Sequence, residues 1–122
     1  MNKLVAIFIV LMLNNYLISE AQTTNPPSFT NGPSNSSSCE YNTATFNVVA
    51  IDYDSLRWQV FSNSTWSDLS DTGTVIGSNT SSLVISNLLL AYSGLQFRCV
   101  AYGPIAPNAV SNTATLTVLK VP

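Results

Sequence analysis

Apolar and polar residues alternate along five segments of the chain, at positions 43–50, 56–61, 81–86, 95–101 and 112–118. Alternation with a period of two is typical of β-strands that bury one face and expose the other. The side chains that we expect to face a core are Ala44, Phe46, Val48, Ala50, Leu56, Trp58, Val60, Leu83, Ile85, Leu95, Phe97, Cys99, Ala101, Ala114, Leu116 and Val118, with Leu88 following the third segment. No segment shows a helical period, so the pattern predicts an all-β protein.

Turn-forming residues separate these segments, and two shorter strands are expected between them, around residues 66–69 and 74–76. The turn signals are residues 52–55, 62–64, 71–73, 77–79 and 103–104. A count of about seven to eight short strands in about 100 residues predicts an antiparallel β-sandwich with Greek-key connections.

The two ends of the chain differ in composition from this patterned region. Residues 1–21 have the parts of a secretory signal peptide: Lys3, an apolar run at 4–13, and small residues before a cut after Ala21. Residues 22–33 are a Pro-rich lead-in or edge strand. The sandwich is expected over residues 34–119, with a start as early as residue 26, and residues 120–122 form a tail.

Charge and residue usage exclude several classes of function. Only 8% of the residues are charged, the formal net charge is −2, and histidine is absent. Without a basic patch we expect no nucleic-acid partner. Without histidine, no Ser-His-Asp or Cys-His site can form, and we expect no enzyme, cofactor or metal site. The paired aspartates Asp52/Asp54 and Asp68/Asp71 are interpreted as turn residues, with calcium binding by Asp52 and Asp54 as the less favoured alternative. No second long apolar run follows the signal peptide, so we expect a secreted or cell-surface chain without a membrane span.

Three stretches are similar in sequence to a known family: WQVFSNSTWSDL, LVISNLLLAYSGLQFRCVAYG and SNTATLTV. Together they resemble immunoglobulin-like domains of secreted bacterial surface and adhesin-type repeat proteins, over residues 26–118. The resemblance implies an immunoglobulin-like sandwich in which Trp58 and Phe97 mark the core. It also implies that Cys99 lies in the sixth strand of that fold and faces the core.

A disulfide bond between the two cysteines, Cys39 and Cys99, is a hypothesis that the resemblance does not decide. An even number of cysteines in an oxidising compartment favours a disulfide. The usual partner position in the second strand is Val48, however, and Cys39 stands nine residues before it. A Cys39–Cys99 bond therefore requires the intervening chain to fold back.

Side chains that point outward from the strands expected around residues 56–61, 66–69 and 95–102 suggest a binding face. Its members are Phe61, Trp66, Arg98 and Tyr102. Arginine and aromatic residues are enriched at interface hot spots. The sequence predicts a non-catalytic module for adhesion or recognition of a protein or glycan. The alternatives are a structural spacer in a longer surface protein, or a carbohydrate-binding module with stacked aromatic rings.

Overall fold

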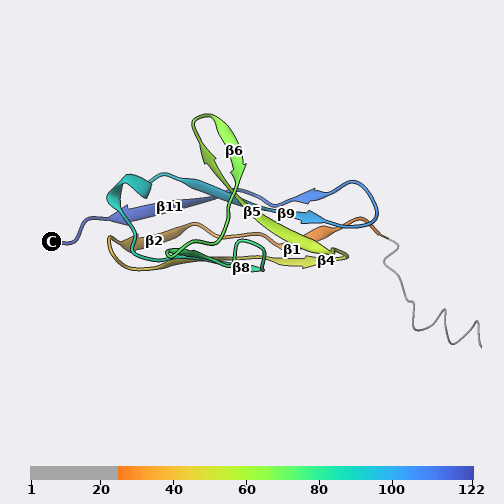
Figure 1. The fold of residues 1–122 in the computed structure, drawn as a ribbon, viewed down its shortest axis with the longest axis horizontal. Coiled ribbons are helices and arrows are strands. Elements are labelled where there is room, and N and C mark those ends of the chain that lie inside the picture. The colour runs from red at the N-terminus through yellow and green to blue at the C-terminus, as the bar shows by residue number, and fades with distance from the viewer. Residues whose placement is uncertain (1–24) are drawn as a thin grey trace, which may run out of the picture.

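Two layers of β-sheet face each other across an apolar core in the computed structural model, which describes residues 25–122 (Figure 1). The signal peptide expected over residues 1–21 lies outside the described residues. The elements in chain order are β1 (Ser28–Asn31), β2 (Ser36–Cys39), β3 (Ala44–Asn47), β4 (Val49–Ile51), β5 (Ser55–Ser62), β6 (Thr65–Asp68), β7 (Val75–Ile76), β8 (Ser82–Ile85), the short 3₁₀ helix η1 (Leu90–Tyr92), β9 (Gln96–Tyr102), β10 (Ala109–Val110) and β11 (Ala114–Leu119).

The larger layer has the strand order β2-β11-β9-β5-β6, with β10 also paired to β9. The smaller layer is the sheet β3-β8-β7, and the β1-β4 pair continues it because β4 follows β3 almost directly along the chain. The chain crosses between the layers from β1 to β2, from β2 to β3, from β4 to β5, from β6 to β7 and from β8 to β9. These crossings give the Greek-key sandwich that the sequence predicted.

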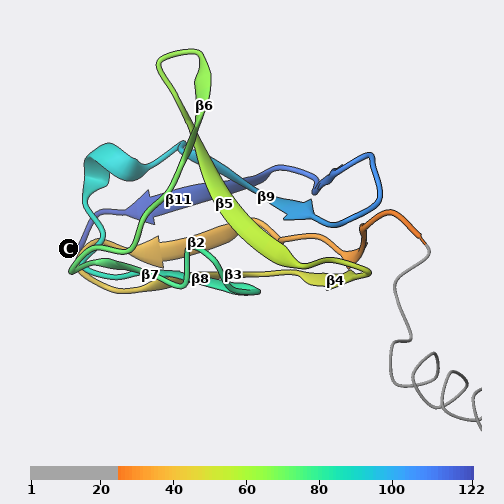
Figure 2. The same cartoon turned by 45° about the vertical axis from the view of Figure 1, so that its right-hand side comes forward.

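The β5–β6 hairpin extends beyond the two layers, as Figures 1 and 2 show. Its two-residue turn, Asn63 and Ser64, has positive φ at both positions (53° and 63°). Two positive φ values are characteristic of a type I′ turn, whose twist matches that of the strands it joins. The turn therefore fixes the register that pairs Phe61 with Trp66.

The core contains the inward-facing residues of the alternating segments. Trp58 lies at its centre, with 0% of its surface exposed, and donates its indole N–H to the Thr80 carbonyl over 2.7 Å. Phe46 and Phe97 come from opposite layers and pack with ring centroids 5.0 Å apart. Burial of this set supplies the main free energy of folding, at about 25 cal/mol per Å² of apolar surface.

The structure departs from the sequence pattern in three respects. Residues 36–39 show no apolar alternation, yet they form β2, which pairs with β11. That pairing is parallel, so the sandwich is not wholly antiparallel. Val100 alternates with the inward Cys99 and Ala101, yet only 6% of its surface is accessible.

Candidate functional site

The outward surface of strands β5, β6 and β9 carries the residues that the sequence singled out for binding. We define the β5–β6–β9 face by the six side chains Arg57, Gln59, Phe61, Trp66, Asp68 and Arg98. Strand register brings them together: β5 pairs with β6 on one edge and with β9 on the other, so that Gln59 stands opposite both Asp68 and Arg98. Side chains directly opposite each other on one face of a sheet are close enough to interact.

An arginine–aromatic cluster lies at the centre of this face. The Arg98 guanidinium carbon is 4.2 Å from the centroid of the Trp66 ring, within the range of a cation–π interaction. The Phe61 and Trp66 rings have centroids 5.2 Å apart and planes inclined by 54°. The structure thus brings together three of the four residues predicted for the face.

Hydrogen bonds between side chains hold this cluster in place. The Nε of Arg98 donates to Gln59 Oε1 over 2.8 Å, and Nε2 of Gln59 donates to Asp68 Oδ1 over 2.9 Å. Asp68 Oδ2 is also 3.7 Å from Nε of Arg57. Because both partners of this ion pair are partly exposed, the pair contributes only about 0–1 kcal/mol. The chain of contacts mainly restricts the rotamers of the face.

Arg57 connects the face to the rest of the molecule. Its Nη1 donates to Asn79 Oδ1 over 2.8 Å and to the Leu69 carbonyl over 3.3 Å. Arg57 and Arg98 are the only arginines among residues 25–122, and Asp68 is the one acidic residue of the face. The face therefore carries a formal charge of 2 − 1 = +1, although the whole chain has a net charge of −2.

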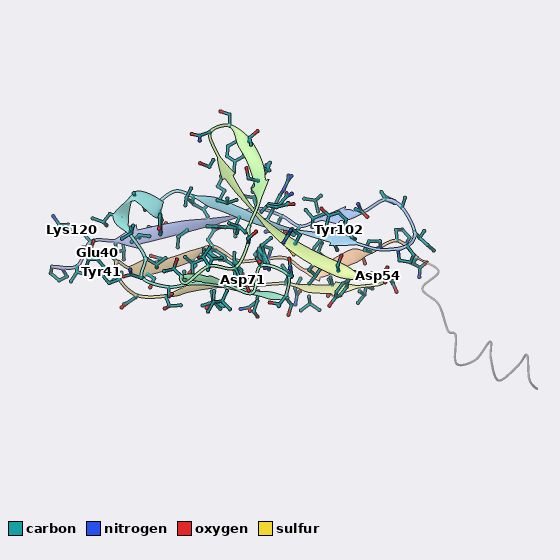
Figure 3. All side chains as sticks on the ribbon, viewed as in Figure 1. Glu40, Tyr41, Asp54, Asp71, Tyr102 and Lys120 are labelled. Atoms are coloured by element: carbon teal, nitrogen blue, oxygen red, sulfur yellow. The ribbon has the colours of Figure 1, made fainter. Side chains whose placement is uncertain are left out.

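Tyr102 lies apart from this cluster. It is on the same side of β9 as Arg98 but four residues further along, about 13 Å at 3.3 Å per residue, and it pairs with Ser55. Figure 3 shows it toward the end of the molecule that carries Asp54. Tyr102 is 37% exposed and lines a separate hollow of about 320 Å³ with Arg57 and Asn79.

Sequence reasoning had treated Asp68 as a turn residue, and this interpretation is wrong. Asp68 is the last residue of β6 and accepts the hydrogen bond from Gln59. Its position opposite Gln59 could have been read from the hairpin register once the Asn63-Ser64 turn was recognised. Asp71, in contrast, does stabilise a loop: its Oδ1 accepts hydrogen bonds from the Ser78 backbone N–H and hydroxyl, and these bonds lower the pKa of its carboxyl.

The hypothesis of a Cys39–Cys99 disulfide is corrected by the structure, in which both cysteines are free. Cys39 stands opposite Leu119 of β11. The pairing of Ala114 with Phe97 places Cys99 level with residue 112, seven positions away, or about 23 Å along the strand. A disulfide requires Cα atoms within about 7 Å. Cys99 is fully buried, and this burial raises the pKa of its thiol to about 11.

The described residues contain neither a cluster of metal ligands nor a membrane-spanning helix. No three His, Cys, Asp or Glu side chains of residues 25–122 gather as a metal site. In the same part of the chain, no helix has the length and apolar character needed to cross a bilayer.

Comparison with solved structures identifies the fold as immunoglobulin-like. No protein-family model and no curated protein matches the chain. A mutant titin M10–obscurin-like 1 Ig complex is similar with a TM-score of 0.63 and 20% identity, over 80% of this chain and 97% of that chain. The titin M3 domain has a TM-score of 0.62 and 20% identity, over 79% and 99%.

Proteins with more than one such domain also match. The Ig1-2 module of the Drosophila receptor protein tyrosine phosphatase DLAR has a TM-score of 0.60 and 19% identity, and covers 80% of this chain. Our chain spans 50% of that module. The identities are low, so these likenesses establish the fold alone. The protein therefore has an immunoglobulin-like fold, as the sequence predicted.

Proposed function

We propose that this protein is a secreted or cell-surface recognition module, without catalytic activity, that binds a protein partner through the β5–β6–β9 face. The observation that carries the proposal is the arginine–aromatic cluster of Arg98, Trp66 and Phe61, held by the hydrogen bonds of Gln59 and Asp68. Arginine and tryptophan are the residue types most often found at hot spots. Side chains that are already ordered lose less entropy on binding.

The bacterial surface-protein type remains part of this proposal. It is supported by the sequence resemblance alone, because the similar structures reported above are titin and DLAR domains. Secretion is supported by the signal-peptide pattern of residues 1–21. If the signal is cut after Ala21, the N-terminal sequence of the exported protein will begin at Gln22. An exported protein that retains Met1 would contradict this part of the proposal.

The binding proposal is tested by screening the purified protein, made multivalent, against an array of extracellular proteins and glycans. We expect a protein ligand whose affinity falls by about 30-fold or more in Trp66→Ala and in Arg98→Ala, because hot-spot truncations cost about 2 kcal/mol or more. Tyr41→Ala and Lys120→Ala are matched controls. They remove an aromatic and a basic side chain at the opposite end of the molecule from Tyr102 (Figure 3).

The other outcomes of the screen decide between the alternatives. Binding that survives both face variants would place recognition elsewhere on the molecule. An array without protein or glycan ligands would support the spacer. Glycan binding lost in Trp66→Ala would support a carbohydrate-binding module. The carbohydrate-binding module has less support, because a sugar ring stacks best on a flat aromatic platform. The Phe61 and Trp66 rings are inclined by 54°, and Tyr102 lies apart from both.

A further inference from the structure

A cavity of about 170 Å³ lies between the two layers, on the opposite side of β5 from the β5–β6–β9 face. Val60, which alternates with Gln59 and Phe61, forms part of its wall. Leu95, Phe97 and Leu116 continue that wall in the larger layer, and Val75 and Ile85 line it from the smaller one. The cavity is therefore an extension of the core that side chains leave unfilled.

The lining of this cavity is almost entirely apolar. Five of its residues, Val60, Leu69, Val75, Tyr92 and Leu95, are only partly buried although they pack against the core. Thr74 and Tyr92 are the only lining residues with polar side-chain atoms, and no lining residue is charged. Water in a cavity needs two to four polar partners, so this site holds water poorly.

Backbone hydrogen bonds order the walls of the cavity. Leu69 N–H donates to the Trp58 carbonyl over 2.9 Å, which fixes the segment leaving β6. Thr72 N–H donates to the Val75 carbonyl over 2.8 Å, which closes the loop before β7. On the opposite wall, Leu116 N–H donates to the Leu95 carbonyl over 2.9 Å. These bonds fix the backbone on each side of the cavity.

We propose that this cavity binds one small, uncharged apolar molecule, such as an aromatic ring of about six carbon atoms. The size supports this occupant, because a dry apolar cavity of about 150 Å³ in another protein binds benzene. The partly exposed lining residues give access from solvent. A ligand would complete the burial of apolar side chains that the fold leaves only partly buried. The site is independent of the recognition function proposed above, since it uses the inner side chains of β5 and not the outer ones.

The test is a titration of the purified exported protein with benzene, followed by NMR of the valine and leucine methyl groups. We expect saturable shifts confined to the methyl groups of Val60, Leu69, Val75, Leu95 and Leu116, and a rise in Tm with benzene concentration. Val75→Phe, which fills the cavity, should weaken binding by about tenfold or more. Val49→Phe is the control, because Val49 is an exposed valine on an edge strand of the same layer.

A second variant keeps the test decisive if Val75→Phe does not fold. Val75→Ala enlarges the cavity, and we expect it to bind toluene more tightly than the wild-type protein does. The proposal is overturned if benzene causes no saturable shift up to its solubility limit, or if the shifts are scattered over the surface. It is equally overturned if the filled variant binds benzene as well as the wild type.

Discussion

Trp58 and Val60 lie two residues apart on the same inward side of β5, yet their surroundings differ. Trp58 is fully buried, and the loop between β7 and β8 covers it: the Ser78 carbonyl accepts its backbone N–H over 2.8 Å and the Thr80 carbonyl accepts its indole N–H. Val60 is only partly buried, because it lines the cavity, whose lining in the smaller layer is Val75 of the two-residue strand β7 and Ile85 of β8.

The comparison shows that alternation determines the direction of a side chain but not whether another element covers it. The closed region around Trp58 and the open region around Val60 follow the same pattern in sequence. They differ because one is opposed by a hydrogen-bonded loop and the other by a strand that ends early. Stability should therefore be concentrated in the closed region.

Trp58→Ala should destabilise the protein most. Removing a fully buried tryptophan costs about 3–5 kcal/mol and also leaves the Thr80 carbonyl without its donor. The change would be measured as the difference in free energy of unfolding by urea, followed by circular dichroism. A loss below about 1 kcal/mol would mean that the region around Trp58 is not the tightly packed part of the core.

Cys99→Ser should cost about 1–3 kcal/mol, because it places a hydroxyl in the closed region, where the Cys99 sulfur has only a 4.0 Å contact with the Val100 carbonyl. Cys39→Ser, at a half-buried position on β2, should change stability much less. Thiol titration adds a second measurement. In the native protein a thiol reagent should react with Cys39 but not with Cys99, whose pKa is raised to about 11 by burial.

The same titration tests whether the cysteines are free. After unfolding without reductant, both thiols should react. Thiols that become reactive only after reduction would contradict the free cysteines of the structure.

A valine pair compares the two regions with the same chemical change. Val48→Ala, in the closed part of the core, should cost about 2 kcal/mol, whereas Val60→Ala beside the cavity should cost about 1 kcal/mol. Urea denaturation of both variants under one set of conditions gives the difference directly. Equal losses would show that the cavity wall is as well packed as the centre of the core.

Asp71→Asn should have the smallest effect, and the effect should depend on pH. The hydrogen bonds from Ser78 lower the pKa of the Asp71 carboxyl in the folded protein, so its ionised form stabilises the fold above the unfolded pKa of about 3.9. That contribution disappears as the pH falls through the lowered folded pKa. The stability difference between wild type and variant should therefore be present at neutral pH and shrink in acid. A difference that stays constant down to strongly acid pH would contradict the role of the carboxylate.

Much of this fold could be predicted from the sequence, because β5, β9 and β11 each have a clear period of two. The cluster of Phe61, Trp66 and Arg98 was also predictable, since outward positions of neighbouring strands meet. Strand β2 was not predictable in this way: three of its four residues are serines, so no apolar alternation marks it. Its strand conformation depends on pairing with β11, a segment far away in the sequence.

The cavity could not be predicted from the sequence either. Val60 and Leu95 alternate as core residues should, and only the short β7 and the route of residues 69–74 leave them half covered. The contribution of Asp68 to the face depends on the register of the hairpin, which the turn at Asn63 and Ser64 sets.

The parallel pairing of β2 with β11 also has a consequence for the order of folding. Ser36 pairs with Leu116, 116 − 36 = 80 residues later. A chain emerging from the ribosome can form the β5–β6 hairpin at once, but β2 has no partner until β11 has been made. Contacts of such long sequence separation slow folding, typically to milliseconds or seconds in sandwiches of this kind. Until then the backbone groups of Ser36–Cys39 stay available to other chains, so this short, serine-rich segment is the point at which a nascent molecule is most open to mispairing.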